Sequence, residues 1–345
     1  MNGIVIDAGN ALIKAKVFTG GEIVFPHAFT ELSEAQYLNI IHSYGSGGIP
    51  ADYMRLNNKC YAVGEAAERA GIQQHKRGAG RYERGYVGVL AAAAIARSYA
   101  NSCELSVFIS HPPGDINHID ALLGAVLGRW EVEICNRRNV YQVTYANCYD
   151  EPTGGLMNVI LNDAGTAYSK HGLRGQRLLV IDIGGGTTDF IVTTETGEID
   201  YGLARSIPVG IIRVIDQFET SFRARYKEST KETQSLNQER VRDAIRIGEF
   251  RGGGHVLICQ EEAAQARNLL VNLILREVQS RYGGGFNFDG ILLTGGGAGL
   301  LWEYIADGLN NDNLHLADDP DSIHLANVRG GLKLWRLYKT IGVIS

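Results

Sequence analysis

One pattern of residues occurs twice in this chain and limits the folds that it can adopt. The pattern is an apolar, β-rich segment, an Asp-x-Gly, a turn of small residues and a second strand. It occurs as GIVIDAGNALIKAKVF (Gly3–Phe18) and as LLVIDIGGGTTDFIVTT (Leu178–Thr194). A candidate third strand follows each copy, at Gly21–Phe29 and Gly197–Ile207. The repeat predicts two halves of similar plan, each opening with a hairpin that has an aspartate at its mouth.

Helical and strand patterns alternate after each hairpin. They predict helices near residues 84–100, 116–129, 209–225 and 261–281, and strands near residues 103–113, 140–146 and 288–294. The order β-β-β-α-β-α in both halves indicates mixed sheets covered by helices, which is an α/β fold. Residues 27–82 and the polar stretch after Tyr226 interrupt this order, and we expect a small inserted subdomain at each.

The bulk composition excludes several classes of protein. The 345 residues, of which 45% are hydrophobic, suffice for two packed domains. Because the net charge is −5 and no block of like charges occurs, we expect no broad nucleic-acid surface. The five cysteines are scattered and form no CxxC pair, which argues against a disulfide framework and a zinc site.

No segment predicts a secretion signal or a membrane anchor. GIVIDAG follows Met1 and Asn2 directly, without the basic start of a signal peptide. The longest apolar run, Val89–Ala96, is far shorter than the roughly 20 residues that span a bilayer. The tail Leu337–Ser345 is too short for a convincing amphipathic anchor. We therefore expect a soluble cytoplasmic protein that does not bind membranes.

Three glycine triplets raise the question of phosphate binding. Any one triplet favours a turn, because glycine adopts positive φ without steric cost. Gly283–Gly285 follows no strand or aspartate and is interpreted as a helix end and linker. In the second hairpin, Gly184–Gly186 would expose successive N–H groups to an anion, and the hydroxyls of Thr187 and Thr188 would add donors.

Each hairpin also places an acidic side chain at the end of its first strand. A carboxylate beside a phosphate would be repelled unless a divalent cation lay between them, and Mg²⁺ is usually reached through one or two carboxylates. Asp7 and Asp182 are therefore candidate metal ligands, mainly through water. Gly9, Asn10 and Lys14 provide a second set of phosphate donors. The alternative for Lys14 is a solvated lysine on a strand.

The third triplet, Gly295–Gly297, stands between a predicted strand and a predicted helix. Backbone at such a junction can approach a ligand closely, and the helix N-terminus favours phosphate or nucleoside oxygens. The triplet lacks the GxGxxG spacing and lies near the end of the chain, so a dinucleotide-binding enzyme is not predicted.

Together, five segments resemble the motifs of the actin, DnaK chaperone and sugar-kinase superfamily, in the family's order and over essentially the whole chain. They are the two hairpins, NCYDEPTGG (Asn147–Gly155), LLTGGGAGLL (Leu292–Leu301) and ANVRGGLKLW (Ala326–Trp335). The resemblance implies two similar ribonuclease H-like lobes around a nucleotide cleft, each with an inserted small subdomain. Lobe I would span residues 1–160, with an insertion at about 27–82 and a completing helix at about 325–345. Lobe II would span residues 161–324, with an insertion at about 226–260.

The resemblance also implies roles for particular residues. The chain would bind ATP or GTP with Mg²⁺, with Asp7 and Asp182 towards the metal and Gly295–Gly297 against the adenosine. Glu151 matches the position that orients the attacking water, and Thr188 would assist by holding a water. Taken alone, the EPT sequence at Glu151 is an ordinary helix start, since proline suits the first turn.

Within the superfamily, the chain most resembles the compact prokaryotic actin-like proteins of the ParM type. That resemblance implies an ATPase that polymerises head to tail into dynamic filaments for plasmid or phage DNA segregation, with a DNA-binding adaptor as a partner. The tyrosines of the first insertion would either contact neighbouring subunits or pack the subdomain; they are Tyr37, Tyr44, Tyr53 and Tyr61. The alternative function is a monomeric ATP-dependent phosphotransferase or a chaperone-type reactivating ATPase of the same fold.

Overall fold

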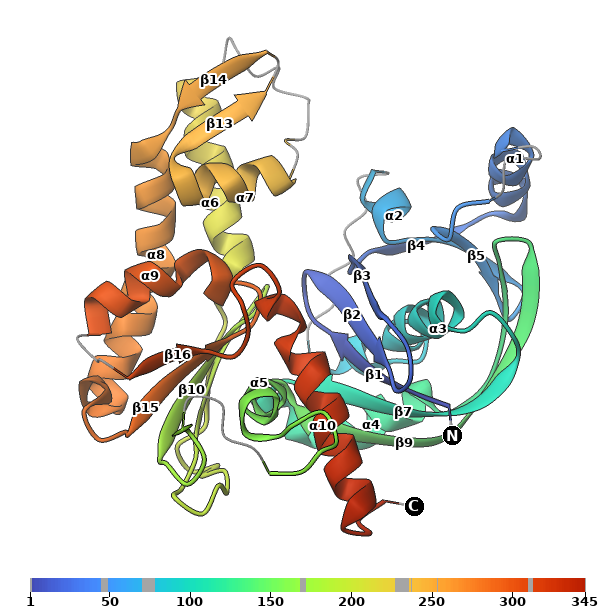
Figure 1. Ribbon diagram of the computed structural model, residues 1–345. Coiled ribbons are helices and arrows are strands. Elements are labelled where there is room, and N and C mark those ends of the chain that lie inside the picture. The colour runs from blue at the N-terminus through green and yellow to red at the C-terminus, as the bar shows by residue number, and fades with distance from the viewer. Residues whose placement is uncertain are drawn as a thin grey trace. The chain divides into compact units, whose positions relative to one another are not determined.

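The computed structural model divides the chain into two compact units (Figure 1). Unit 1 comprises Met1–Tyr168 and Asn327–Ser345, and unit 2 comprises Ser169–Ala326. The residues that the structure describes are 2–44, 49–69, 78–167, 172–226, 236, 238–252, 254–309 and 313–344.

Unit 1 is built on a nine-stranded mixed sheet in the order β3-β2-β1-β7-β9-β8-β5-β6-β4. Its strands are β1 (Gly3–Ala8), β2 (Leu12–Val17), β3 (Glu22–Pro26), β4 (Phe29–Leu32), β5 (Tyr53–Leu56), β6 (Lys59–Val63), β7 (Cys103–His111), β8 (Gly128–Ile134) and β9 (Arg137–Asp150). Strands β1, β7 and β9 run parallel, so their carboxyl ends share one edge of the sheet. The predicted hairpin at the start of the chain is the antiparallel pair β1 and β2.

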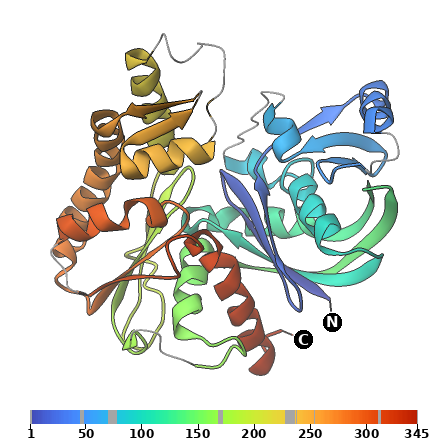
Figure 2. The ribbon, with the colours of Figure 1, turned by 45° about the horizontal axis from the view of Figure 1, so that its top comes forward.

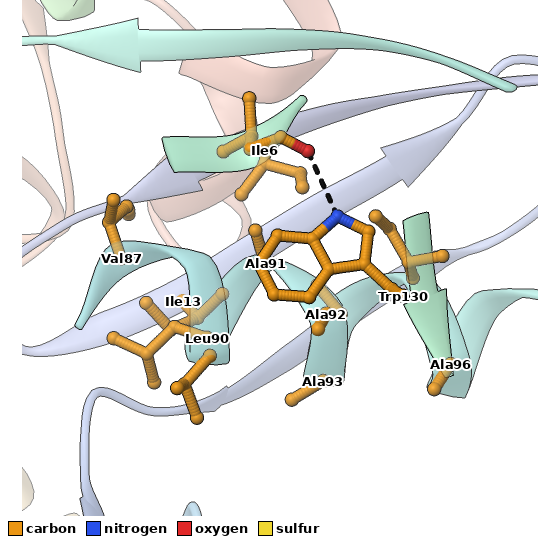
Figure 3. Close-up of a cluster of buried hydrophobic side chains, with 14 of the residues drawn as sticks. Ile6, Ile13, Val87, Leu90, Ala91, Ala92, Ala93, Ala96 and Trp130 are labelled. Carbon is orange, nitrogen blue, oxygen red and sulfur yellow. Dashed lines mark hydrogen bonds between the residues drawn. The ribbon is translucent and has the colours of Figure 1, made fainter. Parts of the chain in front are cut away.

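Helices cover both faces of this sheet. They are α1 (Glu34–Tyr44), α2 (Glu65–Arg69), α3 (Val87–Ser98), α4 (Ile119–Val126), α5 (Glu151–Ile160) and α10 (Ala326–Thr340). The alanine-rich helix α3 packs on one face, where Trp130 lies among its small side chains and donates its indole N–H to the Val126 carbonyl (Figure 3). On the opposite face, Trp335 of α10 packs against Phe108 of β7.

The first insertion extends the main sheet instead of standing apart from it. Strand β5 pairs with β8, and β6 and β4 continue outward from β5. Tyr37 and Tyr61 are buried in this region, which assigns these two tyrosines to packing. The rings of Tyr44 and Tyr53 contact each other, with centroids 6.1 Å apart.

Unit 2 has a five-stranded mixed sheet in the order β12-β11-β10-β15-β16. Its elements are β10 (Leu178–Ile183), β11 (Thr188–Val192), β12 (Arg205–Ile207), α6 (Ile211–Arg225), α7 (Gln238–Ile247), β13 (Glu249–Gly252), β14 (His255–Ile258), α8 (Gln260–Arg281), β15 (Gly290–Thr294), α9 (Ala298–Leu309) and β16 (Leu314–Leu316). Figure 2 shows α7 and the β13–β14 hairpin at one end of the long helices α6 and α8. Part of the predicted polar insertion, residues 227–235 and 237, lies outside the described residues.

The two units share one strand plan, as the repeat predicted. The order β3-β2-β1-β7-β9 of unit 1 corresponds to β12-β11-β10-β15-β16 of unit 2, with the same parallel and antiparallel pairs. The predicted strand over Gly197–Ile207 was wrong for most of its length. Gly197 closes a turn with a positive φ of 84°, and Ile199 makes an isolated bridge to Thr193. A second turn at residues 201–203 follows, and only Arg205–Ile207 forms a strand. The triplet Gly283–Gly285 does end α8, as a short 3-10 turn.

In the described ranges, no helix has both the length and the hydrophobicity of a transmembrane span.

Candidate functional site

The aspartate of the first hairpin is held by two neighbouring strands. Asp7 lies at the end of β1 and is 1% exposed. Lys14 stands opposite Asp7 in the β1–β2 register, and its Nζ donates to Asp7 Oδ2 at 2.7 Å. Ser110 of β7 donates to the other carboxylate oxygen at 3.1 Å. Lys14 is therefore buried against a carboxylate at the turn and is not the solvated lysine of the alternative interpretation.

The turn after Asp7 has its carbonyls fixed by buried side chains. Arg81 Nη2 donates to the Ala8 carbonyl at 2.5 Å, and His27 Nδ1 lies 2.5 Å from the Gly9 carbonyl. A neutral His27 that donates from Nδ1 can accept at Nε2 from the Tyr86 hydroxyl, which is 2.9 Å away. Within the described part of the chain, the N–H groups of the next two turn residues, at positions 10 and 11, make no hydrogen bond. Asn10 thus offers an N–H to a ligand.

The second hairpin fixes its turn by a different device. The carbonyls of Gly184 and Gly185 accept hydrogen bonds from the N–H groups of Ile211 and Ile212, each at 3.0 Å. These donors are the first residues of α6, whose N-terminal N–H groups have no partner inside the helix. Among the described residues, the N–H groups at positions 185 to 187 make no hydrogen bond. Gly185, Gly186 and Thr187 therefore have three successive N–H groups without a hydrogen bond, a run of donors that a turn can direct at an anion.

Two buried carboxylates face each other beside this second turn. Asp182, at the end of β10, pairs in register with Asp189 of β11, and the two are 2% and 0% exposed. Thr187 donates its hydroxyl to Asp189 Oδ2 at 2.9 Å. Thr188 is fully buried and donates its hydroxyl to the Val209 carbonyl at 2.8 Å. The hydroxyl proton of Thr188 is thus donated to the backbone, and its oxygen remains as an acceptor.

The third glycine triplet packs directly against Asp182. Gly295 has a φ of 84°, and a Cβ built there would lie 2.1 Å from Asp182 Oδ1. Gly297 donates its N–H to the Ile183 carbonyl at 2.8 Å, and a Cβ there would lie 2.4 Å from Ile183 Cγ2. Gly296 has room for a Cβ, whose nearest neighbour would be His324 Cβ at 3.5 Å. Residues more than 100 positions apart in sequence are thereby brought to one strand edge.

Glu151 stands on the shared edge of the unit 1 sheet. It is the first residue of α5, directly after β9, and it is 7% exposed. The parallel order β1, β7, β9 puts the ends of these strands side by side, so Asp7 and Glu151 lie at the same edge. Arg81 joins the two positions, because its Nη2 lies 3.8 Å from Glu151 Oε1 and also bonds the turn after Asp7.

A model of the family "Archaeal actin homologue MreB-like, C-terminal" matches residues 180–307. No curated protein matches the chain in sequence. The non-polymerisable quadruple mutant of pCBH ParM has a TM-score of 0.73 at 19% identity, covering 97% of this chain and 99% of its own.

Two further solved structures extend this likeness. In a 15-stranded ParM filament from Clostridium botulinum, the matched chain has a TM-score of 0.68 at 18% identity, with 96% of this chain and 98% of that chain covered. ParM of Bacillus thuringiensis, solved with ATP, has a TM-score of 0.70 at 16% identity, with 99% of each chain covered. This chain has the actin-like fold.

The resemblance inferred from the five motifs is therefore confirmed at the level of the fold. The family model covers the part of the actin-like fold that holds the second hairpin and the third glycine triplet. Each unit of the fold carries a buried aspartate beside a turn whose N–H groups are exposed.

The carboxylates beside the two turns are ligands of the type that holds Mg²⁺ bound to a polyphosphate. In the described part of the chain, no group of three or more His, Cys, Asp or Glu residues is arranged to hold a metal ion. Mg²⁺ needs no such cage, because it keeps several waters and is commonly held by one or two carboxylates and the phosphates themselves. Asp7 and Asp182 each supply one carboxylate of that kind.

Two residues of this region were absent from the sequence-based set of site residues. Asp189 was detectable, because superposing the two hairpin sequences places it opposite Asp182 where Lys14 stands opposite Asp7. Arg81 had no comparable signal, because it lies in the inserted segment and reaches Glu151 across a sequence separation of 70 residues.

Proposed function

We propose that this chain is an actin-like ATPase that binds ATP with Mg²⁺ and assembles head to tail into filaments. The observation that carries the proposal is the duplicated hairpin, with a buried aspartate and exposed turn N–H groups in each unit. A single glycine turn is weak evidence, whereas two turns at equivalent places in two equivalent sheets point to a ligand with several phosphates. The solved relatives add a ParM with ATP and a ParM filament.

The residues of each unit would then have distinct tasks. The N–H groups of Asn10 and of Gly185, Gly186 and Thr187 would bind phosphate oxygens, and Gly295–Gly297 would lie against the adenosine. Asp7 and Asp182 would hold Mg²⁺ mainly through water, and the bound ion would neutralise charge on the phosphates. Lys14 would add a positive charge beside the terminal phosphates while staying paired with Asp7.

Hydrolysis would depend on Glu151. A buried carboxylate at the start of α5 can accept a hydrogen bond from a water and align it for attack on the terminal phosphate. The EPT sequence is thus both a helix start and the position of the catalytic group. Thr188 would assist through its oxygen lone pairs, since its proton is donated to Val209.

The proposed setting is plasmid or phage DNA segregation in the cytoplasm, with a DNA-binding adaptor as the partner. A net charge of −5 suits a link to DNA through another protein more than direct contact. The five cysteines are all free, which suits a reducing compartment.

The deciding experiment measures phosphate release and pelleting as functions of protein concentration. With ATP and Mg²⁺, we expect turnover per molecule to rise steeply above a critical concentration, because filament contacts favour the hydrolysing state. The pellet should contain filaments by negative-stain microscopy, and ADP should give fewer. A turnover per molecule that is independent of concentration, with no filaments across salts and nucleotides, would instead identify the monomeric phosphotransferase or reactivating ATPase.

A further inference from the structure

Arg81 is a buried arginine that lies among acidic side chains. It lies on the short 3-10 helix at Gly78–Tyr82, and its side chain is 9% exposed. The guanidinium makes one hydrogen bond to the Ala8 carbonyl and lies 3.8 Å from the carboxylate of Glu151. A single side chain thus reaches both the phosphate turn of unit 1 and the proposed catalytic carboxylate.

The neighbouring residue anchors Arg81 in this place. The Tyr82 hydroxyl donates to the Asp115 carboxylate, and its ring stacks on His118 with centroids 5.4 Å apart. Asp115 and His118 belong to the 3-10 helix that follows β7. The arginine is therefore tied to the strand whose Ser110 bonds Asp7.

The charge of Arg81 is retained despite its burial. Burial by itself disfavours a charged guanidinium, but nearby groups, among them the carboxylates of Glu151, Asp115 and Asp7, raise the pKa of Arg81. Breaking a buried pair of this kind leaves an uncompensated charge, so each partner restricts the other's position.

We infer that Arg81 is a positioning residue for hydrolysis, which sets the place of the Glu151 carboxylate relative to the phosphate turn. This inference rests on the proposed function. Arginine suits the task because its planar guanidinium stays charged when buried and presents its N–H donors in fixed directions, which a lysine ammonium cannot do. A carboxylate displaced by about 1 Å can lose roughly a hundredfold in rate, so small losses of positioning are measurable.

The test compares Arg81→Gln and Arg81→Lys with matched changes at Arg97. Arg97 is another arginine with little exposure, its side chain being 12% exposed, and it bonds the Ala51 carbonyl and the Asp52 carboxylate. We expect Arg81→Gln to lower kcat per assembled subunit by roughly tenfold to a hundredfold, and Arg81→Lys to recover part of that loss. Arg97→Gln should lower the thermal midpoint comparably and leave kcat unchanged.

A double-mutant cycle separates positioning from a general structural role. Glu151→Ala should slow hydrolysis with ATP binding and assembly largely retained, and adding Arg81→Gln should lower kcat little further. Any loss of ATP affinity caused by Arg81→Gln should persist in both backgrounds, because it comes from the Ala8 contact. If Arg81→Gln does not fold, Arg81→Lys and Arg97→Lys are compared in the same cycle.

The outcomes separate this inference from the proposed function. Multiplicative kcat losses in the double variant, or equal kcat values for the Arg81 and Arg97 variants, would overturn the role of Arg81 alone. A wild-type chain that hydrolyses no ATP under any of the assembly conditions would overturn both proposals.

Discussion

The space at Gly295 fits glycine but not the added methyl group of alanine. The backbone there has a φ of 84°, and a Cβ would lie 2.1 Å from Asp182 Oδ1. The adjacent Gly296 has no such contact below 3.5 Å. The triplet is therefore not uniform, since its first position is constrained by the carboxylate and its second is open.

We predict that Gly295→Ala lowers ATP affinity by at least about tenfold, because forcing a Cβ against Asp182 costs about 1–3 kcal/mol. Gly296→Ala is the matched control and should keep the affinity within about threefold, a change under 1 kcal/mol. Titration with a fluorescent ATP analogue measures both. Equal affinities for the two variants would show that Asp182 and the triplet do not act on one ligand.

The two hairpins differ in the residue that stands opposite the aspartate. Lys14 balances Asp7 in unit 1, whereas Asp189 stands opposite Asp182 in unit 2 and adds a second negative charge. Two adjacent buried carboxylates repel each other unless protons, donors or a cation offset them. The position opposite the aspartate is therefore basic in unit 1 and acidic in unit 2.

Among the elements, helices α5 and α10 approach each other at an unusually short distance. A Cβ built on Gly330 of α10 would lie 1.7 Å from the Gly154 carbonyl oxygen of α5. Gly331 is similarly close to the ring of Tyr149, at 2.6 Å. Lys333 of α10 donates to the Asn158 carbonyl at 2.8 Å, which satisfies a backbone group of α5. The paired glycines of the EPTGG and RGG sequences are what permit this crossing.

We predict that Gly330→Ala lowers the free energy of unfolding of unit 1 by about 1–3 kcal/mol, because α5 and α10 must move apart. Gly124→Ala is the control, since a Cβ on this glycine of α4 meets nothing within 4 Å. That variant should gain about 0.5–1 kcal/mol from helix propensity. Urea unfolding measures both changes in free energy, and stability gains in both variants would refute the close crossing.

At the scale of the whole molecule, the first and the last segments of the chain pack against each other within unit 1. Arg329 of α10 forms a bidentate ion pair with Glu22 of β3, at 2.8 and 2.9 Å, across a sequence separation of 307 residues. Phe18 packs on Trp335 with ring centroids 5.0 Å apart. The end of the chain is therefore part of the same structural unit as its beginning.

This closure makes a prediction about pH. The Arg329 hydrogen bond, with a smaller contribution from Lys16, lowers the pKa of Glu22 below its ordinary value of 4.5 against the opposing effect of partial burial. A lowered pKa adds stability above about pH 4.5, and that stability is lost as the pH falls through the folded-state value. We expect Arg329→Gln to cost about 1 kcal/mol at pH 7 and progressively less below pH 4.5.

Urea unfolding of wild type and Arg329→Gln across this pH range tests the prediction. The control makes the same comparison in the Glu22→Gln background. Because this background lacks the titrating group, the effect of Arg329→Gln on stability should there be independent of pH. A difference between wild type and Arg329→Gln that stays constant from pH 7 to pH 3 would contradict the assignment.

The features that could be predicted from the sequence alone are local ones. The two hairpins, their aspartates and the shared strand plan follow from residues close together in the chain, where strand pattern and turn chemistry act directly. The same local reasoning failed over Gly197–Ile207, because a turn at residues 201–203 interrupts a pattern that looks continuous.

The contacts between distant segments could be read only from the three-dimensional fold. It paired Lys14 with Asp7, committed the Thr188 proton to Val209, joined the first insertion to the main sheet and brought Arg81 to Glu151. Such contacts depend on packing of whole elements, in which a buried charge takes whichever partner the fold brings within reach. Composition and periodicity carry no record of that choice, so the contact between Arg81 and Glu151 became visible only in three dimensions.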